Sequence, residues 1–475
     1  MDIEIKKNYI LNVSNQILSL IIPMITAPYI ARVIGADGIG LYSYCDSIVS
    51  YFVLFASLGL PLYGQKEVSY LQNDRFGRSK VFWETFIIGF VSTALAFVFF
   101  IFFTRDSNNR ILFCILSVNI LSCGIDISWL FQGMENFKTI SVRNFLFRLF
   151  NVVYVFLFVR KKEDLLVYVA GICCFSFANY ASLWFSLRKV ISFVPFKELR
   201  PFKRIPGIIS LFVPTVAIQV YTMLDKTMIG IITNDVFQNG YYEQAIKLSK
   251  MVLTLVTSLG AVMLSRIGSY HSCGDEGKVK KALYNSYRFV WFLSIPLGFG
   301  LSSIASNFVP WFYGDGYGEV VPLLSILSFL IIAIGVSNVT GIQYLIPMGK
   351  QKQYTVSVIV GACSNFVLNV FLIPRFLSFG AAIASLIAET LVTATQLFLV
   401  RKELSVSRIL KSSWKYLVSG IIMFVAVRLE GSILEPSAWN TAVMVLSGMI
   451  VYFLALFVLR DGFLKELFSK EKDCV

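Results

Sequence analysis

The chain is 475 residues long, 56% of its residues are hydrophobic, only 15% are charged, and its formal net charge is +14. A soluble protein of this length would not show one apolar run after another of about 20 residues, the length that a helix needs to cross a bilayer. The composition therefore excludes a soluble enzyme and predicts an all-α polytopic membrane protein.

Cysteine and histidine indicate neither a metal site nor a disulfide framework. The eight cysteines lie mostly within apolar runs, with no CxxC pair and no metal-ligand spacing, so we expect them to be packing residues. The only histidine, His271, lies among Ser, Cys and Gly, and we expect it to be a solvated loop residue without a catalytic role.

The apolar runs predict about 14 transmembrane helices. The first run, about 9–31, is too long for a signal-peptide core and lacks a small-residue cleavage site, so we expect it to be retained as a span. Pro23 and Pro28 within it predict a bent helix. We expect the further spans at roughly 41–60, 80–103, 111–131, 142–159, 165–187, 208–232, 242–266, 284–305, 320–346, 354–374, 378–400, 415–429 and 440–460.

Lysine and arginine concentrate in alternate loops, in a ratio of roughly four to one, which predicts that both termini are cytoplasmic. This distribution explains the net charge as anchoring beside anionic lipid, so no nucleic-acid partner is expected. The longest loops, near 188–207 and 267–283, are expected on the cytoplasmic side. Neither is long enough for a separate soluble catalytic domain.

A weak internal repeat divides the chain. Ser57-Leu58-Gly59 recurs as Ser258-Leu259-Gly260, and the same offset aligns Asp46 with Lys247. Transporters are often built from such repeats, with the substrate site at the interface between them. Coincidence within apolar sequence stays open as the alternative. We expect two pseudo-symmetric six-helix bundles around a central cavity, the first over 1–190 and the second over 208–402. A cytoplasmic linker at 191–207 joins them, and two further transmembrane helices with a cytoplasmic tail follow over 403–475.

Charged residues in the seventh and eighth predicted spans are the strongest site candidates. An ionisable group inside a bilayer costs roughly 2.5–3.5 kcal/mol, so it usually marks a polar pathway. Asp225 and Lys226 fall in the outer half of the seventh span. Glu243, Lys247 and Lys250 follow the spacing i, i+4, i+7, which places them on one face of the eighth.

Arg32 and Asp46 occupy the matching region of the first half of the chain. A cavity lined by Arg32, Lys226, Lys247 and Lys250 would be cationic and would attract a phosphate or diphosphate. The alternative is that the neighbouring carboxylates neutralise the lysines, or that the lysines reach the membrane interface. Because Asp46 and Lys247 are equivalent in the repeat, we hypothesise that they form an outer gate.

Single acidic and basic residues lie in or near other spans, among them Asp126, Glu389 and Arg428. A buried carboxylate could carry a coupling proton, although a hydrogen-bonded helix contact is its commoner role. The candidates for gating or ion coupling are Asp46, Asp126, Asp225, Glu243 and Glu389.

Several motifs resemble one known family, the Wzx-type polysaccharide flippases. They are ARVIGADGIGLYSY at 31–44, ASLGL at 56–60, DISWLFQGMENFK at 126–138, LDKTMIG at 224–230 and GYY at 240–242. The resemblance covers most of the chain, is strongest over 1–270, and rests on packing and turn signatures.

The resemblance implies membership of the MOP (MATE-like) superfamily, with two six-helix bundles, a central cavity and alternating access. Such flippases move undecaprenyl-diphosphate-linked oligosaccharide repeat units, of O-antigen or capsule type, from the inner to the outer leaflet of the bacterial inner membrane. It implies that Arg32, Lys226 and Lys247 engage the anionic substrate. The polysaccharide polymerase and chain-length machinery are the implied protein partners, and a monomer is the implied state. No cofactor is expected, and coupling to H+ or Na+ stays open.

The sequence leaves three alternative functions open. A multidrug cation antiporter of the same superfamily would favour an acidic cavity, whereas the lysines favour an anionic substrate. A membrane-embedded polymerase or ligase generally needs a large outer loop or a carboxylate-rich metal motif, and the sequence shows neither. A non-transporting scaffold would leave the lysines within the spans without a role.

Overall fold

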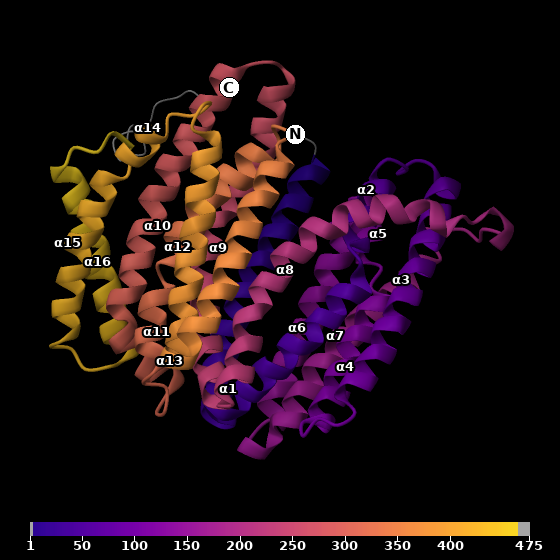
Figure 1. The fold of residues 1–475 in the computed structure, drawn as a ribbon, viewed down its shortest axis with the longest axis horizontal. Helices are drawn as coiled ribbons and strands as arrows, with labels where there is room; N and C mark the ends of the chain where they lie inside the picture. Colours follow the sequence, from indigo (N-terminus) through magenta and orange to yellow (C-terminus); the bar gives the residue numbers. More distant parts are fainter. Residues whose placement is uncertain (1–2, 464–475) are drawn as a thin grey trace. The chain divides into compact units, whose positions relative to one another are not determined.

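The computed structural model describes the backbone of residues 3–463, and the side chains of 21–463 apart from some positions between 210 and 272. The described residues form helices joined by short turns, with no strand among them (Figure 1). The helical class expected from the composition is confirmed. The chain divides into two compact units, Met1–Thr227 and Met228–Val475. This division differs from the expected bundle boundaries, which stay a prediction.

Unit 1 contains the first seven α-helices and the greater part of the eighth. Their bounds are α1 Ile3–Ser57, α2 Leu60–Ser69, α3 Arg75–Thr104, α4 Arg110–Ile125, α5 Ser128–Gly133, α6 Phe137–Phe158, α7 Leu165–Leu187 and α8 Ile205–Thr233, with short 3-10 turns η1 Lys162–Asp164, η2 Phe196–Glu198 and η3 Pro201–Arg204.

Helix α1 is 55 residues long and is interrupted at Gly35, whose φ of 80° and ψ of 169° are not helical. Glycine reaches this left-handed region without steric cost, and a Cβ atom at this position would lie 2.9 Å from Asp37 Oδ1. An ion pair of 2.7 Å between Lys162 Nζ and Asp37 Oδ2 ties η1 to the same place. The helix is therefore interrupted at Gly35. Pro23 and Pro28 lie upstream of this interruption, inside the helix.

Two large apolar clusters join the helices in the described part of unit 1. One joins α1, α3, α4 and α7 through fully buried Cys45, Leu116 and Val169. The other joins α3 to α5, where Phe82 stacks on Trp129 with ring centroids 5.7 Å apart. These clusters hold α4, α5 and α7 in fixed positions, and α6 packs against α7.

A buried carboxylate fixes the connection between α7 and α8. Glu84 of α3 is 2% exposed and accepts hydrogen bonds of 2.7 Å from Arg200 N and 2.8 Å from Arg204 Nε. Arg204 Nη1 also reaches Glu67 Oε2 at 2.9 Å. Since a buried charge is tolerated only when it is paired, these contacts hold η3 firmly on α2 and α3.

Unit 2 contains the C-terminal end of α8 and all later helices. Their bounds are α9 Val236–Ser272, α10 Glu276–Tyr313, α11 Val320–Leu327, α12 Leu330–Asn338, the π-helix η4 Val339–Leu345, α13 Gln351–Val400, α14 Val406–Lys411, α15 Trp414–Gly431 and α16 Ala438–Val458.

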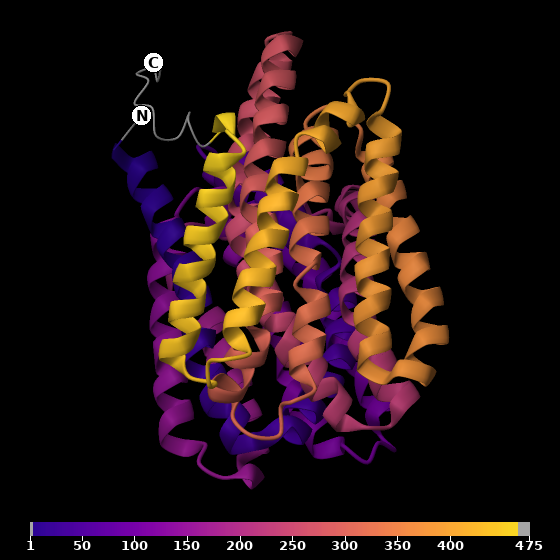
Figure 2. The same ribbon diagram turned by 90° about the vertical axis from the view of Figure 1, so that its left-hand side faces the viewer.

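Helix α10 is the centre of the packing in unit 2. It contacts α9, α11, α12, α15 and α16, and the pair α15 and α16 runs beside it (Figures 1 and 2). Ile295 and Tyr287 of α10 are fully buried in the shared core, where the Tyr287 hydroxyl lies 2.8 Å from Thr340 Oγ1 of η4. Helix α13 is 50 residues long and is interrupted at Leu377, which has a φ of 52°.

Ten helical stretches among the described residues are long and apolar enough to cross a membrane. Two of them, Ile21–Ser69 and Gln351–Val400, are about twice the length that one span requires and contain the breaks at Gly35 and Leu377. The exact number of about 14 spans stays a prediction.

One expected loop is wrong. Helix α9 continues to Ser272 and α10 begins at Glu276, so the expected loop near 267–283 shrinks to a tight turn. His271 is exposed, as expected, but it lies in the last turn of α9 instead of in a loop.

Candidate substrate-binding site

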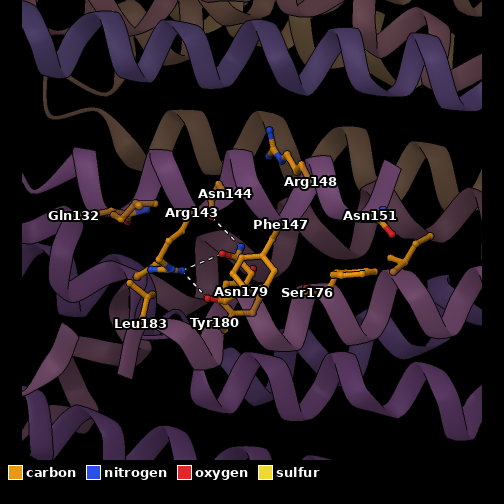
Figure 3. Close-up of a pocket in the computed structure, with 14 residues that line it drawn as sticks. Gln132, Arg143, Asn144, Phe147, Arg148, Asn151, Ser176, Asn179, Tyr180 and Leu183 are labelled. Carbon is orange, nitrogen blue, oxygen red and sulfur yellow. Dashed lines mark hydrogen bonds between the residues drawn. The ribbon is translucent and has the colours of Figure 1, made fainter. Parts of the chain in front are cut away.

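A polar cavity of about 390 Å³ lies within unit 1, between α5, α6 and α7 (Figure 3). Helix α6 supplies one wall through a stripe at helical spacing, formed by Ile140, Arg143, Asn144, Phe147, Arg148 and Asn151. The next face of α6 carries exposed apolar side chains, among them Leu149, Phe150 and Val153. An apolar outer face and a polar inner face are what a membrane helix beside a hydrophilic pathway requires.

Arg143 organises the cavity. Its Nε donates to Ser182 Oγ at 2.7 Å, and its Nη2 donates to the carbonyl oxygen of Asn179 at 2.6 Å and to Asn179 Oδ1 at 3.0 Å. Asn179 Nδ2 in turn donates to Asn144 Oδ1 at 2.9 Å. Figure 3 shows Arg143 and Asn144 of α6 converging on Asn179 of α7. This network fixes the positively charged group between two helices in one orientation.

Two buried polar atoms of the cavity have no hydrogen-bond partner among the described residues. They are Arg143 Nη1, a donor, and Asn151 Oδ1, an acceptor. An unsatisfied buried polar atom costs about 1–3 kcal/mol, so it commonly marks a place where a ligand or water binds. A hydroxyl group, which donates and accepts at once, matches this pair. Phe147 and Tyr180 add aromatic rings of the kind that pack on sugar faces.

The charge of the cavity is positive on balance. Arg143 and the exposed Arg148 both line it. Asp126, the residue that follows α4, does not line the cavity, but it accepts a 2.8 Å hydrogen bond from Ser128 N and attracts Arg143 electrostatically. Because its described lining residues include two arginines and no carboxylate, the cavity favours an anionic or hydroxyl-rich ligand over a cation.

Unit 2 contains a pocket of the opposite kind. A cavity of about 310 Å³ lies between α10, α15 and α16 and is walled almost entirely by apolar side chains, such as Leu297, Met423 and Met449. Gly300 and Gly448 also line it. A pocket of this composition accommodates a hydrocarbon chain and offers little to a charged group.

The structure places four of the site residues expected from the sequence on α1 and α8 of unit 1. Arg32 is exposed, Asp46 and Lys226 are half-buried, and Asp225 is 6% exposed. Helices α1 and α8 are in contact beside these residues. Ser47 follows Asp46, Thr227 follows Lys226, and the hydroxyl oxygens of Ser47 and Thr227 lie 2.9 Å apart. The structure therefore brings the segments around Asp46 and Lys226 together.

The remaining expected residues lie in other parts of the chain. Glu243 and Lys247 on α9 are half-buried and Lys250 is exposed. Glu389 is half-buried on α13, beyond the break, and interacts electrostatically with Tyr354. Asp46 and Lys247 belong to different units, so their pairing as a gate stays a prediction.

The sequence prediction missed the cavity around Arg143. A signal was present, because Arg143, Arg148 and Asn151 all fall inside the predicted span at 142–159. Arg143 and Asn144 were not among the site residues expected from the sequence. Their partner Asn179 lies on another helix, and a linear pattern does not show which two helices face each other.

Comparison with known proteins gives consistent results. Residues 5–270 match the family model described as polysaccharide biosynthesis protein. A protein of Escherichia coli (strain K12) named as an O-antigen transporter is 23% identical over 415 residues, which cover 84% of this chain and 97% of that protein.

Two solved structures share the fold. The lipid II flippase MurJ in an inward closed conformation superposes with a TM-score of 0.65 at 19% identity, covering 97% of this chain and 99% of that chain. An inward-facing multidrug resistance MATE family transporter of the MOP superfamily gives a TM-score of 0.60 at 12% identity, covering 83% and 99%. The fold of the chain is therefore that of the MOP transporters.

Proposed function

Because the chain belongs to the polysaccharide biosynthesis protein family, we propose that it is a flippase for lipid-linked oligosaccharides. The family match and the MOP-type fold confirm the resemblance that the sequence motifs indicated, and they place the chain with transporters instead of enzymes. The substrate class, the direction and the binding residues are the proposal.

The observation that carries the proposal is the polar cavity of unit 1. It combines positive charge, an unpartnered donor on Arg143, an unpartnered acceptor on Asn151, and aromatic rings. Such a set binds the hydroxyl groups of a sugar and tolerates a nearby diphosphate, for which arginine is a strong partner. An organic cation would meet two arginines there, which disfavours the multidrug antiporter.

The apolar pocket of unit 2, taken by itself, has the composition to accommodate a hydrocarbon chain. A lipid-linked sugar carries a long isoprenoid chain, and burial of each CH₂ group from water contributes about 0.8 kcal/mol. The cavity near Leu297, Met423 and Met449 offers such burial.

The chain would work in the bacterial inner membrane with about 14 spans in two six-helix bundles and with both termini in the cytoplasm, as the distribution of basic residues predicts. If the repeat unit is synthesised on the cytoplasmic side, the substrate starts in the inner leaflet, so transport would run from the inner to the outer leaflet. The polymerase and chain-length machinery would receive the product, and coupling to H+ or Na+ would use one of the acidic residues of the spans. The proposed substrate contacts of the central cavity are Arg32, Lys226, Lys247 and Lys250.

The test is translocation of a fluorescent lipid-diphosphate oligosaccharide in proteoliposomes, measured by its protection from a membrane-impermeant quencher. The native chain is compared with Asn151→Leu, which removes the acceptor, and with Lys138→Gln, a control that removes an exposed cation of α6 outside the cavity. We expect at least about a tenfold slower rate for Asn151→Leu, corresponding to one lost buried hydrogen bond. We expect no change for Lys138→Gln.

Lys226→Ala and Lys247→Ala test the proposed central cavity in the same assay. Slower transport by these folded variants supports a cationic pathway. If the native chain is inert towards lipid-linked sugars and instead exports a cationic dye, the flippase proposal is wrong and the antiporter takes its place.

A further inference from the structure

A second basic pocket lies in unit 2, far along the chain from the polar cavity of unit 1. It has a volume of about 440 Å³ and is formed by the end of α9, the beginning of α10 and Phe463. Its basic residues are Arg266, Lys278 and Lys281. The proposed flippase function assigns no role to this pocket.

The pocket is built from one face of α10. Its lining residues follow helical spacing along α10 and are Lys278, Lys281, Ala282, Asn285, Ser286 and Phe289. From α9, Arg266 adds a guanidinium whose Nε donates to Tyr270 Oη at 2.9 Å, which orients the group over the Tyr270 ring.

A buried hydroxyl marks the ligand position. Ser286 is 2% exposed, lines the pocket, and its Oγ has no hydrogen-bond partner in the part of the chain that the structure describes. Lys278 forms a 2.8 Å ion pair with Asp275 of the turn, whereas neither Arg266 nor Lys281 forms an ion pair with any described residue. Two cations and a hydroxyl donor thus surround the same space.

The pocket has an apolar end and a basic end. Met263 and Phe289 lie furthest from the α9–α10 turn, whereas Lys278 and Lys281 lie close to it. With 37 and 38 residues, α9 and α10 are about 55 Å long, well beyond a hydrocarbon core of about 30 Å. The hairpin of α9 and α10 extends past the neighbouring ends of α15 and α16 (Figure 2). We therefore expect the turn between α9 and α10, and with it the basic end of the pocket, to lie beyond the hydrocarbon core.

We propose that this pocket binds the phosphate group of an anionic phospholipid. The phosphate would accept from Arg266, Lys281 and the Ser286 hydroxyl, and the glycerol and upper acyl chains would pack on Met263 and Phe289. A zwitterionic headgroup would bring its ammonium group against the basic wall and bind less tightly. A bound lipid would join α9 to α10 at the end where they meet, and would stabilise unit 2 by mass action.

Lipid binding is measured on the purified full chain by native mass spectrometry and by the shift in thermal unfolding midpoint. The ligands are phosphatidylglycerol, phosphatidylcholine and inorganic phosphate. We expect tight binding and a raised midpoint with phosphatidylglycerol, weaker binding with phosphatidylcholine, and no rise in midpoint with inorganic phosphate. Each cation near a lipid surface contributes a factor of about 5, so Arg266→Gln and Lys281→Gln should each weaken binding about 5-fold and their combination about 30-fold. Lys280→Gln removes an adjacent exposed charge outside the pocket, and it should bind as the native chain does.

Ser286→Ala separates binding from folding. Removing an unsatisfied buried hydroxyl should leave the lipid-free chain as stable as before or slightly more stable, while phosphatidylglycerol binding weakens about 5-fold. Equal binding of phosphatidylglycerol by the Arg266→Gln/Lys281→Gln double variant would overturn the proposal. Stabilisation by inorganic phosphate without any by the lipid would overturn the lipid assignment in favour of a soluble phosphate ester. None of these readouts depends on transport, so a failure of the proposed flippase activity leaves this test intact.

Discussion

Replacing Arg143 by alanine is expected to weaken the contact between α6 and α7 by about 2 kcal/mol. The guanidinium donates three hydrogen bonds across this contact, one to Ser182 and two to Asn179. A hydrogen bond between membrane helices contributes about 0.6 kcal/mol on average, so three of them contribute about 2 kcal/mol. The measurement is the free energy of unfolding from a titration of mixed micelles with sodium dodecyl sulfate, followed by circular dichroism.

A double-mutant cycle isolates the part of this energy that comes from one pair. Arg143→Ala, Asn179→Ala and the double variant are compared, because Arg143 Nη2 donates to Asn179 Oδ1 at 3.0 Å. The bond from Asn179 to Asn144 is lost in both the single Asn179 variant and the double variant, so it cancels. We expect a coupling energy of about 0.6–1.7 kcal/mol. Additivity within about 0.3 kcal/mol would refute the network as the structure shows it.

Transport by Arg143→Lys distinguishes charge from geometry. Lysine keeps the positive charge but lacks the planar fork that reaches Ser182 and Asn179 together. If charge in the cavity is what the substrate senses, Arg143→Lys should transport within about 3-fold of the native rate, while Arg143→Ala should fall at least about tenfold. Equal rates for the native chain and a stably folded Arg143→Ala variant would remove Arg143 from the substrate pathway.

Three further predictions concern folding. Glu84→Gln removes the buried charge that pairs with Arg204, and it should lower the free energy of unfolding by about 2 kcal/mol. This is less than the roughly 3–5 kcal/mol lost when a fully buried pair is broken, because Arg204 is 23% exposed. An unchanged unfolding midpoint would contradict this prediction. Gly64→Ala places a Cβ 2.3 Å from Trp129 Cε3, so it should destabilise unit 1 by about 1–3 kcal/mol, whereas a stabilised variant would show that the ring moves freely. Burial acts to raise the pKa of Glu403, but hydrogen bonds from a lysine and a tyrosine outweigh it and hold that pKa below its usual range. Its stabilising effect should be complete above the unfolded-state pKa of about 4.3 and be lost as the pH falls through the lower folded-state pKa. Thermal unfolding of the native chain and of Glu403→Gln between pH 3 and pH 7 checks this, and parallel curves would contradict it.

Composition and local pattern were sufficient to predict that the chain is a helical membrane protein. Long apolar runs cannot be buried in a soluble domain of this size, so they identify the spans without knowledge of their packing. The motif at 31–44 and the other motifs of the chain also identified the family, because packing and turn signatures are local features of the sequence. Helix ends were less predictable, and the loop expected near 267–283 proved to be mostly helix because polar residues continue a helix beyond the bilayer as readily as they form a loop.

Only the tertiary structure decided which polar residues share a cavity. Arg143 and Asn179 are 36 positions apart and meet because α6 packs against α7 at one rotation, which the apolar clusters of unit 1 determine. The same holds for Ser286 and Arg266, which lie on two helices of one hairpin and face the same pocket. Charge in a span is visible in the sequence, but its partner depends on helix contacts between distant segments. Those contacts arise from side-chain packing over the whole unit, and no local pattern encodes them.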